Sequence, residues 1–180
     1  MPNIQRGWSL VELLTVLMIA SVLSLAAVPS LRAMFFPLQV RNTAEEFSSW
    51  MSMARSEAIK RRQGRVVVCV ASSIDACDAQ GDWQKGWLLF HDVNGNSELD
   101  PEDTVIRYQS KLPEGLIIRG NTHVARYISY VSSGRTLLVS GGLQVGTLSF
   151  CHQESQTAGW QVVLSATGRV RLARWTPDRC

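Results

Sequence analysis

An uninterrupted apolar stretch near the start of the chain limits what the rest of the sequence can fold into. No residue from Leu13 to Leu31 is ionisable, and the only charged residues between Trp8 and Phe36 are Glu12 and Arg32. A helix needs about 20 apolar residues to cross the hydrocarbon core of a bilayer. The sequence therefore predicts a transmembrane helix over residues 8–36, followed by a segment long enough to bury a core of its own.

Glu12 separates three interpretations of this N-terminus. A secretory signal peptide would have a basic start, an apolar run and a cleavage site such as Ser24-Leu25-Ala26, and a plain membrane anchor would have the same apolar run. A carboxylate inside such a run costs about 2.5 to 3.5 kcal/mol on insertion scales. Neither a signal peptide nor a plain anchor has a use for it, so a third interpretation, a processing signal that needs the carboxylate, is favoured.

Gly7, the apolar aromatic Trp8 and Glu12 as the fifth residue after the glycine resemble the type IV prepilin motif. The resemblance implies that a prepilin peptidase removes residues 1–7 as a leader peptide and methylates the new N-terminus at Trp8. The Glu12 carboxylate would then meet the terminal ammonium of a neighbouring subunit, so that assembly relieves a buried charge. Trp8 departs from the family pattern, in which phenylalanine is usual.

Residues 37–64 predict an amphipathic continuation of the helix. Apolar residues recur there at three- and four-residue spacing, while the charged residues point elsewhere. Gly64 is expected to end the helix. If the helix is continuous from Trp8, it is about 80 Å long. The predicted core positions are Val40, Ala44, Phe47, Met51, Ala54 and Ala58.

From residue 65 to residue 180 the pattern changes to short strands and predicts a β-rich globular head. β-Branched and aromatic runs alternate with Gly, Pro, Asn and Asp, as in antiparallel sheets. A helix covering such sheets gives an α+β fold. The predicted strands are RVVVCVA, GWLLFHD, TVIRYQ, LIIRG, YISYV, TLLV, GTLSFC and WQVVLS, and we consider the C-terminal TGRVRLARW as a further strand.

All four cysteines follow the apolar segment, which suits an oxidising compartment and two disulfides. Four cysteines allow three pairings, of which Cys69 with Cys77 and Cys151 with Cys180 is the simplest. Zinc is the competing interpretation, but neither pair has the close spacing of zinc ligands.

The order of landmarks resembles the FimT/GspH family of minor type IV pilins and type II secretion pseudopilins over nearly the whole chain. After the leader come the loop between Cys69 and Cys77, GWLLFHDVNGN, LPEGLIIRG and SATGRVRLAR. The resemblance implies a pilin-like fold in which a long N-terminal helix packs on a small two-sheet β head. It also implies a scarce filament subunit that starts assembly or displays a binding surface, with other major and minor pilins as partners.

The C-terminal end is basic. From residue 75 to residue 103 there are eight acids against Lys85 alone, whereas the nine basic residues from Thr104 onward face three acids. Arg169 and Arg171 alternate, so in a strand they would share a face, and Arg174, Arg179 and the stacking surface of Trp175 follow. Arginine forks suit phosphate oxygens. Residues 168–171 resemble the GRxR motif that in the FimT branch is associated with DNA binding in natural transformation. The resemblance implies Gly168, Arg169 and Arg171 as DNA-binding residues, and the basic run adds Arg174 and Arg179 as candidates.

The remaining motifs do not indicate a catalytic site. Oxygen-bearing side chains alternate from Asp92 to Asp100, but the glycine and the final glutamate of a calcium loop are misplaced, so we favour a solvated Asn-Gly turn. His91, His123 and His152 lie on different segments without metal-ligand spacing. We expect no cofactor, no metal and no enzymatic activity.

Three functions remain open. The favoured one is a minor type IV pilin, inserted once in the inner membrane with its head in the periplasm and later part of a pilus, with DNA as an expected ligand. The second is a type II secretion pseudopilin that acts in protein export. The third is a membrane-anchored periplasmic binding protein that never polymerises and keeps its leader.

Overall fold

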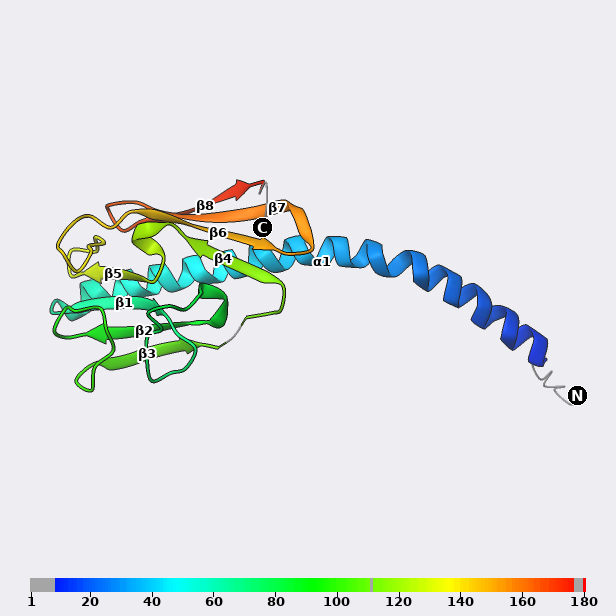
Figure 1. Ribbon diagram of the computed structural model, residues 1–180, viewed down its shortest axis with the longest axis horizontal. Coiled ribbons are helices and arrows are strands. Elements are labelled where there is room, and N and C mark those ends of the chain that lie inside the picture. The colour runs from blue at the N-terminus through cyan, green and yellow to red at the C-terminus, as the bar shows by residue number, and fades with distance from the viewer. Residues whose placement is uncertain (1–8, 111, 177–179) are drawn as a thin grey trace, which may run out of the picture. The chain divides into compact units, whose positions relative to one another are not determined.

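The computed structural model describes residues 9–110, 112–176 and 180, with the backbone alone for residues 26–33 and 155–158. The predicted leader and Trp8 lie outside the described residues. The chain divides into two compact units, the first ending at Phe36 and the second beginning at Pro37 (Figure 1).

The helix α1 (Leu10–Arg61) begins in the first unit with a capping box. The Glu12 amide donates to Ser9 Oγ at 3.2 Å, and the Ser9 amide donates to Glu12 Oε2 at 3.0 Å. This reciprocal pair satisfies two of the amides that a helix start leaves open.

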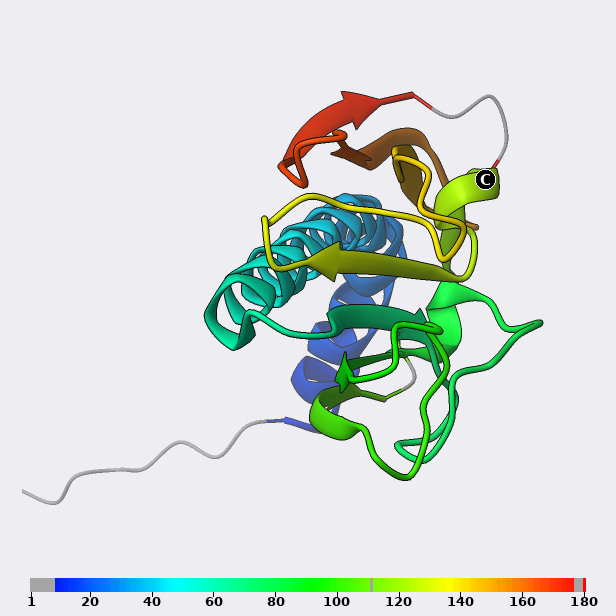
Figure 2. The ribbon, with the colours of Figure 1, turned by 90° about the vertical axis from the view of Figure 1, so that its left-hand side faces the viewer.

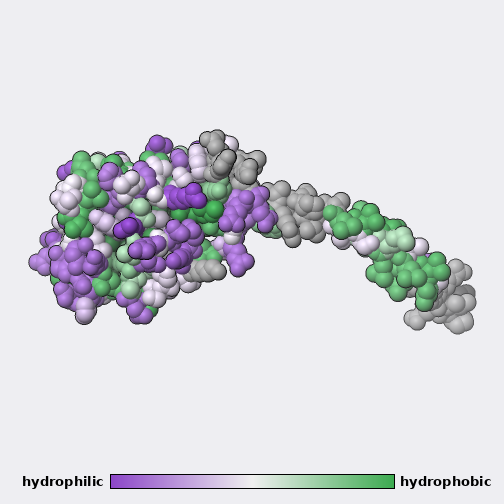
Figure 3. Space-filling view, in the orientation of Figure 1, coloured by the Kyte–Doolittle hydropathy of each residue, from purple (hydrophilic) through white to green (hydrophobic). Residues whose placement is uncertain are grey.

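Apolar side chains surround α1 in the first unit. All residues from Ser9 to Leu25 are exposed, and Figure 3 shows hydrophobic side chains along this part of the surface. Within the described part of the chain, no helix meets the length and hydropathy required of a membrane span.

In the second unit one face of α1 is buried, as the spacing predicts. All six predicted core positions are at most 3% exposed, and Trp50, which the prediction omitted, is fully buried beside them. The helix ends at Arg61, and Arg62 (φ 60°) and Gly64 (φ 66°) then take left-handed backbone conformations that turn the chain into the first strand.

Eight strands form two antiparallel sheets, with the orders β3-β2-β1-β5 and β4-β6-β7-β8 (Figures 1 and 2). A helix with two antiparallel four-stranded sheets confirms the predicted α+β pilin-like fold. The first sheet consists of β1 (Arg65–Val70), β2 (Trp87–Asp92), β3 (Thr104–Gln109) and β5 (Tyr127–Val131). The second consists of β4 (Leu116–Gly120), β6 (Gly146–His152), β7 (Ser155–Leu164) and β8 (Val170–Trp175). Two short 3-10 helices, η1 (Trp83–Lys85) and η2 (Thr122–Val124), lie in the connections.

The main core lies where α1 meets both sheets. Phe47 is at its centre, with its ring 5.2 Å from Trp83 and 5.1 Å from Trp87, both edge-on, and 5.7 Å from Phe150. Edge-to-face contacts of this kind add to the burial of apolar area. One aromatic residue of α1 therefore contacts β2 of the first sheet and β6 of the second.

The predicted strand TLLV, residues 136–139, is wrong. Those residues form only isolated bridges, Tyr130 with Thr136 and Leu137 with Leu143. The reason is the buried side chain of Gln144, which accepts a hydrogen bond from the Ser129 amide at 2.8 Å and donates to the Tyr127 carbonyl at 2.9 Å. A side chain thereby satisfies backbone groups of β5 that a neighbouring strand would otherwise pair.

Both disulfides are present in the simplest pairing. Cys69 of β1 is bonded to Cys77, and Cys151 of β6 is bonded to Cys180, each with Cα atoms 5.7 Å apart. No described cysteine is free, so no thiolate is left for zinc.

Candidate functional site

The basic C-terminal motif lies at the hairpin between β7 and β8. The Gly168 amide donates to the Ser165 carbonyl at 2.9 Å, and the Ser165 amide donates to the Arg169 carbonyl at 3.0 Å. Gly168 has φ 74°, and a Cβ atom there would clash with the carbonyl oxygen of Gly134. The turn itself therefore requires the glycine of the motif. Arg169 belongs to this turn and not to the strand.

β8 is an edge strand whose side chains alternate between two faces. Val170 and Leu172 pack against the main core, whereas Arg171 is exposed. Because successive side chains in a strand point to opposite faces, Arg171 and Trp175 share the outer face and Arg174 shares the inner face. The predicted basic strip is thus divided between two faces of the sheet.

Arg174 is engaged with an aromatic ring. Its guanidinium lies 5.7 Å from the centroid of Trp160, the residue opposite it on β7. Arg41 of α1 lies 5.6 Å from the same centroid and also forms a 2.7 Å ion pair with Glu45. Trp160 therefore joins the helix and the edge strand through two cation–π contacts.

Arg169 lines a groove of about 420 Å³ together with residues of α1. The side of the groove formed by the helix contains Arg55, Ser52 and Ser56, which place a second guanidinium and two hydroxyl groups opposite the hairpin. Sequence analysis did not predict Arg55 as a site residue. The sequence places Arg55 in the predicted helix, but only the tertiary fold brings this part of α1 to the hairpin.

Arg135 lies at the same end of the head, because it follows Gly134, whose carbonyl faces Gly168. None of Arg55, Arg135, Arg169 and Arg171 forms an ion pair with a carboxylate in the described residues. The ion pairs found there involve other cations, namely Arg41 with Glu45, Lys60 and Arg61 with Glu57, and Lys85 with Asp78. The hydrogen bond from Lys60 is the main cause of a pKa for Glu57 below its usual range. We call Arg55, Arg135, Arg169 and Arg171 the hairpin arginines.

Tyr130 is buried beneath the hairpin. Its ring carbon Cε1 is 3.0 Å from the position of a Cβ atom on Gly168, and burial raises the pKa of its phenol. The hydroxyl group is buried without a hydrogen-bond partner in the described residues. The close contact between this ring and the turn fixes the position of the glycine that precedes Arg169.

The predicted processing residues are only partly described. Gly7 and Trp8 lie outside the described residues, as does Arg179 of the predicted DNA-binding set. Glu12 is described, and its carboxylate accepts the hydrogen bond of the capping box. The pattern Ser9-x-x-Glu12 before an apolar run is a sequence signal for this box, which sequence analysis did not use.

The loop after β2 is held by hydrogen bonds among its own residues. The buried Asp92 carboxylate accepts from the amides of Gly95 at 2.6 Å and Ser97 at 2.8 Å. Asp100 accepts from the side chains of Asn94 and Asn96. No group of three or more potential metal ligands from His, Cys, Asp and Glu is found within the described ranges.

The three histidines lie apart. His91 contacts the Gln63 carbonyl at 2.9 Å, His123 belongs to η2, and His152 accepts a hydrogen bond from the Glu154 amide at 3.2 Å. The structure therefore places them in separate local contacts and does not gather them into one site.

A long helix whose second half packs on two small antiparallel sheets defines a pilin-type filament subunit. The model of the family described as type II transport protein GspH matches residues 43–168, and the chain belongs to this family. The match ends at Gly168, so Arg169, Arg171 and Arg174 lie beyond it.

Solved structures of both pilus and secretion subunits are similar to the chain. The type IV minor pilin FimU of Pseudomonas aeruginosa is 19% identical, with a TM-score of 0.59 over 78% of this chain and 94% of that one. The minor pseudopilin EpsH from the type 2 secretion system of Vibrio cholerae is 17% identical, with a TM-score of 0.50 over 75% and 96%. No curated protein matches the chain. At these identities the likeness establishes the fold and is equally compatible with either system.

Proposed function

We propose that the chain is a minor pilin that is processed after Gly7, held in the inner membrane by residues 8–36, and then incorporated into a type IV pilus. Family membership supports a non-enzymatic filament subunit that associates with other pilins. The apolar side chains that α1 exposes from Leu10 to Leu25 support membrane insertion and later packing against neighbouring subunits. Residues 37–64 would complete the helix and residues 65–180 would form the head outside the cytoplasm.

The head, in this proposal, contacts DNA through the hairpin arginines. The observation that carries this is a set of four guanidinium groups, from three separate segments, none of which is neutralised by a described carboxylate. Arg169 and Arg55 line one groove, and Arg171 is exposed on the outer face of β8, two residues after Arg169. Guanidinium groups with free donors suit phosphate oxygens, which supply most of the affinity of non-specific DNA binding. Arg174, which contacts Trp160, contributes to the fold more than to this surface.

The test is a salt titration of DNA binding by the full-length protein in detergent micelles. Replacing Arg169 and Arg171 with Gln should weaken binding several-fold for all sequences alike, and flatten the dependence of affinity on salt by roughly one unit for each lost phosphate contact. The matched control replaces Arg119 and Arg126 with Gln, which removes the same charge elsewhere on the head. Equal losses in both variants would mean diffuse attraction and would contradict the hairpin proposal.

The second candidate function is a pseudopilin of a type II secretion system. The description of the matching family and the likeness to EpsH favour it. Wild-type protein that does not shift DNA at low salt would remove the reason for preferring the pilus, and an export defect in a strain that lacks the chain would then establish the secretion role. Recovery of the chain with its leader intact would instead favour a membrane-anchored periplasmic binding protein that never polymerises.

A further inference from the structure

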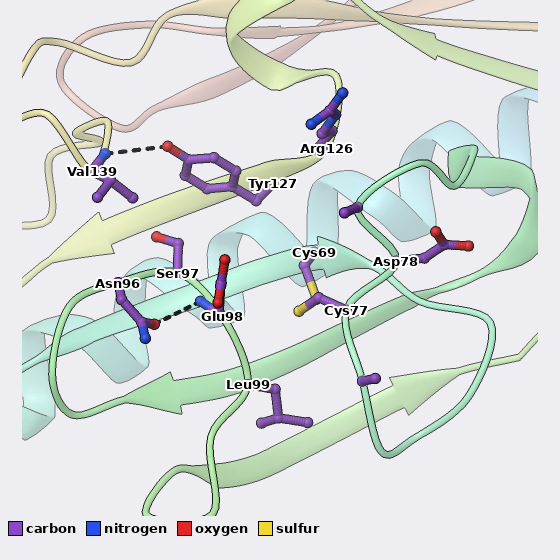
Figure 4. Close-up of a pocket in the computed structure, with 12 residues that line it drawn as sticks. Cys69, Cys77, Asp78, Asn96, Ser97, Glu98, Leu99, Arg126, Tyr127 and Val139 are labelled. Atoms are coloured by element: carbon purple, nitrogen blue, oxygen red, sulfur yellow. Dashed lines mark hydrogen bonds between the residues drawn. A yellow bond between two sulfur atoms is a disulfide. The ribbon is translucent and has the colours of Figure 1, made fainter.

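A cavity of about 540 Å³ lies on the face of the first sheet that points away from α1 (Figure 4). Val66, Val68 and Val70 of β1 face the main core, so Val67 and Cys69 face the other way. The cavity is bounded there by Tyr127 of β5, the disulfide loop of Cys69 and Cys77, and the loop after β2. It shares no lining residue with the groove of Arg169.

The walls of this cavity are fixed before any ligand arrives. The disulfide closes one wall, and the Asp92 carboxylate fixes the loop after β2 through the amides of Gly95 and Ser97. The third wall is held by the Tyr127 hydroxyl, which accepts a hydrogen bond from the Val139 amide at 3.2 Å (Figure 4). A preformed cavity spares a ligand the entropic cost of ordering its site.

Ser97 is the polar group that this architecture leaves unsatisfied. Ser97 lines the cavity and is only 7% exposed, and its buried hydroxyl has no hydrogen-bond partner in the described residues. Its φ of 63° is unusual for a residue other than glycine. The hydroxyl oxygen is itself buried, so a ligand in the cavity could not bond to it without movement of the loop.

Two charged groups on different walls are also unpaired within the described ranges. Both Arg126, between η2 and β5, and Glu98, in the loop after β2, line the cavity. Neither side chain forms an ion pair or a hydrogen bond with another described residue. Asp78, the third charged residue there, is already occupied. It accepts from the Gln80 amide at 3.0 Å, from Ser72 and from Lys85, and the hydrogen bond from Gln80 is the main cause of a pKa below its usual range.

These charges select the class of ligand. A purely acidic ligand would pair with Arg126 but would be repelled by Glu98 and by the acid-rich segment from residue 75 to residue 103. A purely basic ligand would be repelled by Arg126. We propose that the cavity binds a peptide segment of a partner protein that presents one acidic and one basic side chain. Arg126 takes the acid and Glu98 takes the base. Tyr127, Leu99 and Val139 cover the aliphatic stems.

The experiment follows the backbone amides of the full-length protein in micelles by NMR while capped tripeptides are added. The probes are acetyl-Asp-Gly-Lys-amide and its counterparts with two Asp, two Lys or two Gln residues. The Asp/Lys probe should shift the amides of Ser97, Arg126 and Tyr127 with a saturable, weak affinity. It should bind at least about threefold more tightly than each counterpart, as one additional partly exposed ion pair allows. No shift at these amides, or binding of the two-Lys probe at least as tight, would overturn the proposal.

Two substitutions then test the assignment of the charges. Arg126→Gln should move the preference toward the two-Lys probe, and Glu98→Gln should move it toward the two-Asp probe. Such opposite changes are not produced by general loss of structure, which would weaken all probes alike. Arg119→Gln removes a charge from outside the cavity and should leave every affinity unchanged. If both cavity variants lose all probes equally while their spectra remain folded, the proposed charge recognition is wrong.

Discussion

Gly168 combines two structural demands that can be separated by experiment. Its φ of 74° is in the left-handed region, and a Cβ atom would meet the Gly134 carbonyl. Gly168→Ala should therefore lower the free energy of unfolding by about 2 kcal/mol or more. Chemical denaturation of the full-length protein in micelles measures this loss.

Two glycines of the connection between β5 and β6 serve as controls for that substitution. Gly141 has φ 86° with no atom near its Cβ position, so Gly141→Ala should cost only the backbone strain, about 1 kcal/mol. Gly142 has neither a positive φ nor a close contact, so Gly142→Ala should be nearly neutral or slightly stabilising. A Gly168→Ala variant as stable as Gly142→Ala would contradict the described turn.

Trp160 connects two elements, because its ring contacts Arg174 of the edge strand β8 and Arg41 of the helix α1. Removing the Arg174 charge by Arg174→Gln should lower the free energy of unfolding by about 0.5 to 1 kcal/mol through the lost cation–π contact. In a Trp160→Leu background the same change should cost much less, because the partner ring is absent. Arg171→Gln, on the outer face of the same strand, should stay within about 0.5 kcal/mol of the wild type. Equal effects of Arg174→Gln in both backgrounds would exclude the contact as the cause.

The two disulfides differ in the length of chain that they close. Cys151 and Cys180 are 29 residues apart and Cys69 and Cys77 are 8 apart. In the chain-entropy model, replacing the first pair with Ser costs about 3 to 4 kcal/mol and replacing the second about 2 to 3 kcal/mol. Thermal unfolding of the two double variants should rank them in this order, and the reverse order would indicate that strain or loop contacts decide their contributions.

Elements were predicted from sequence where local periodicity determines them. The buried face of α1 follows from helical spacing, and most strands follow from alternating β-branched runs between turn residues. The strand at residues 136–139 failed because its partner groups are satisfied by Gln144, a long-range contact that no local pattern encodes. Trp50 was omitted although it is three residues after Phe47, a spacing that places both on one helical face.

The candidate surfaces were less predictable than the fold. The opposite placement of Arg171 and Arg174 follows from their odd spacing and was available from the sequence. The exclusion of Arg169 from the strand depends on where β8 begins. Arg55 and Arg135 join the hairpin only through packing of distant segments. The cavity at Ser97 depends on three separate segments meeting over one sheet, so composition and spacing alone gave no indication of it.

For the whole molecule, Glu12 has two roles that assembly assays can separate. Glu12→Gln keeps a residue that can complete the capping box but removes the charge, and we expect it to insert into the membrane yet fail to enter filaments. Ser9→Ala loses one capping bond, at a cost of about 1 kcal/mol of helix stability, and should still be incorporated. Recovery of each variant in sheared filaments is the measurement. Normal recovery of Glu12→Gln would show that the charge is not needed.

The bond between Cys151 and Cys180 has a mechanical consequence for the head. β8 is the last strand of its sheet and pairs only with β7, so a pull on an untethered C-terminal end would open its hydrogen bonds one after another, like a zipper. Here the hairpin joins one end of β8 to β7, and the disulfide ties the chain beyond its other end to β6. A pull on Arg169 or Arg171 is therefore carried by β8 together with β7 and, through the disulfide, β6. Reduction of this disulfide should make the head unfold at lower force without altering the surface that carries the hairpin arginines.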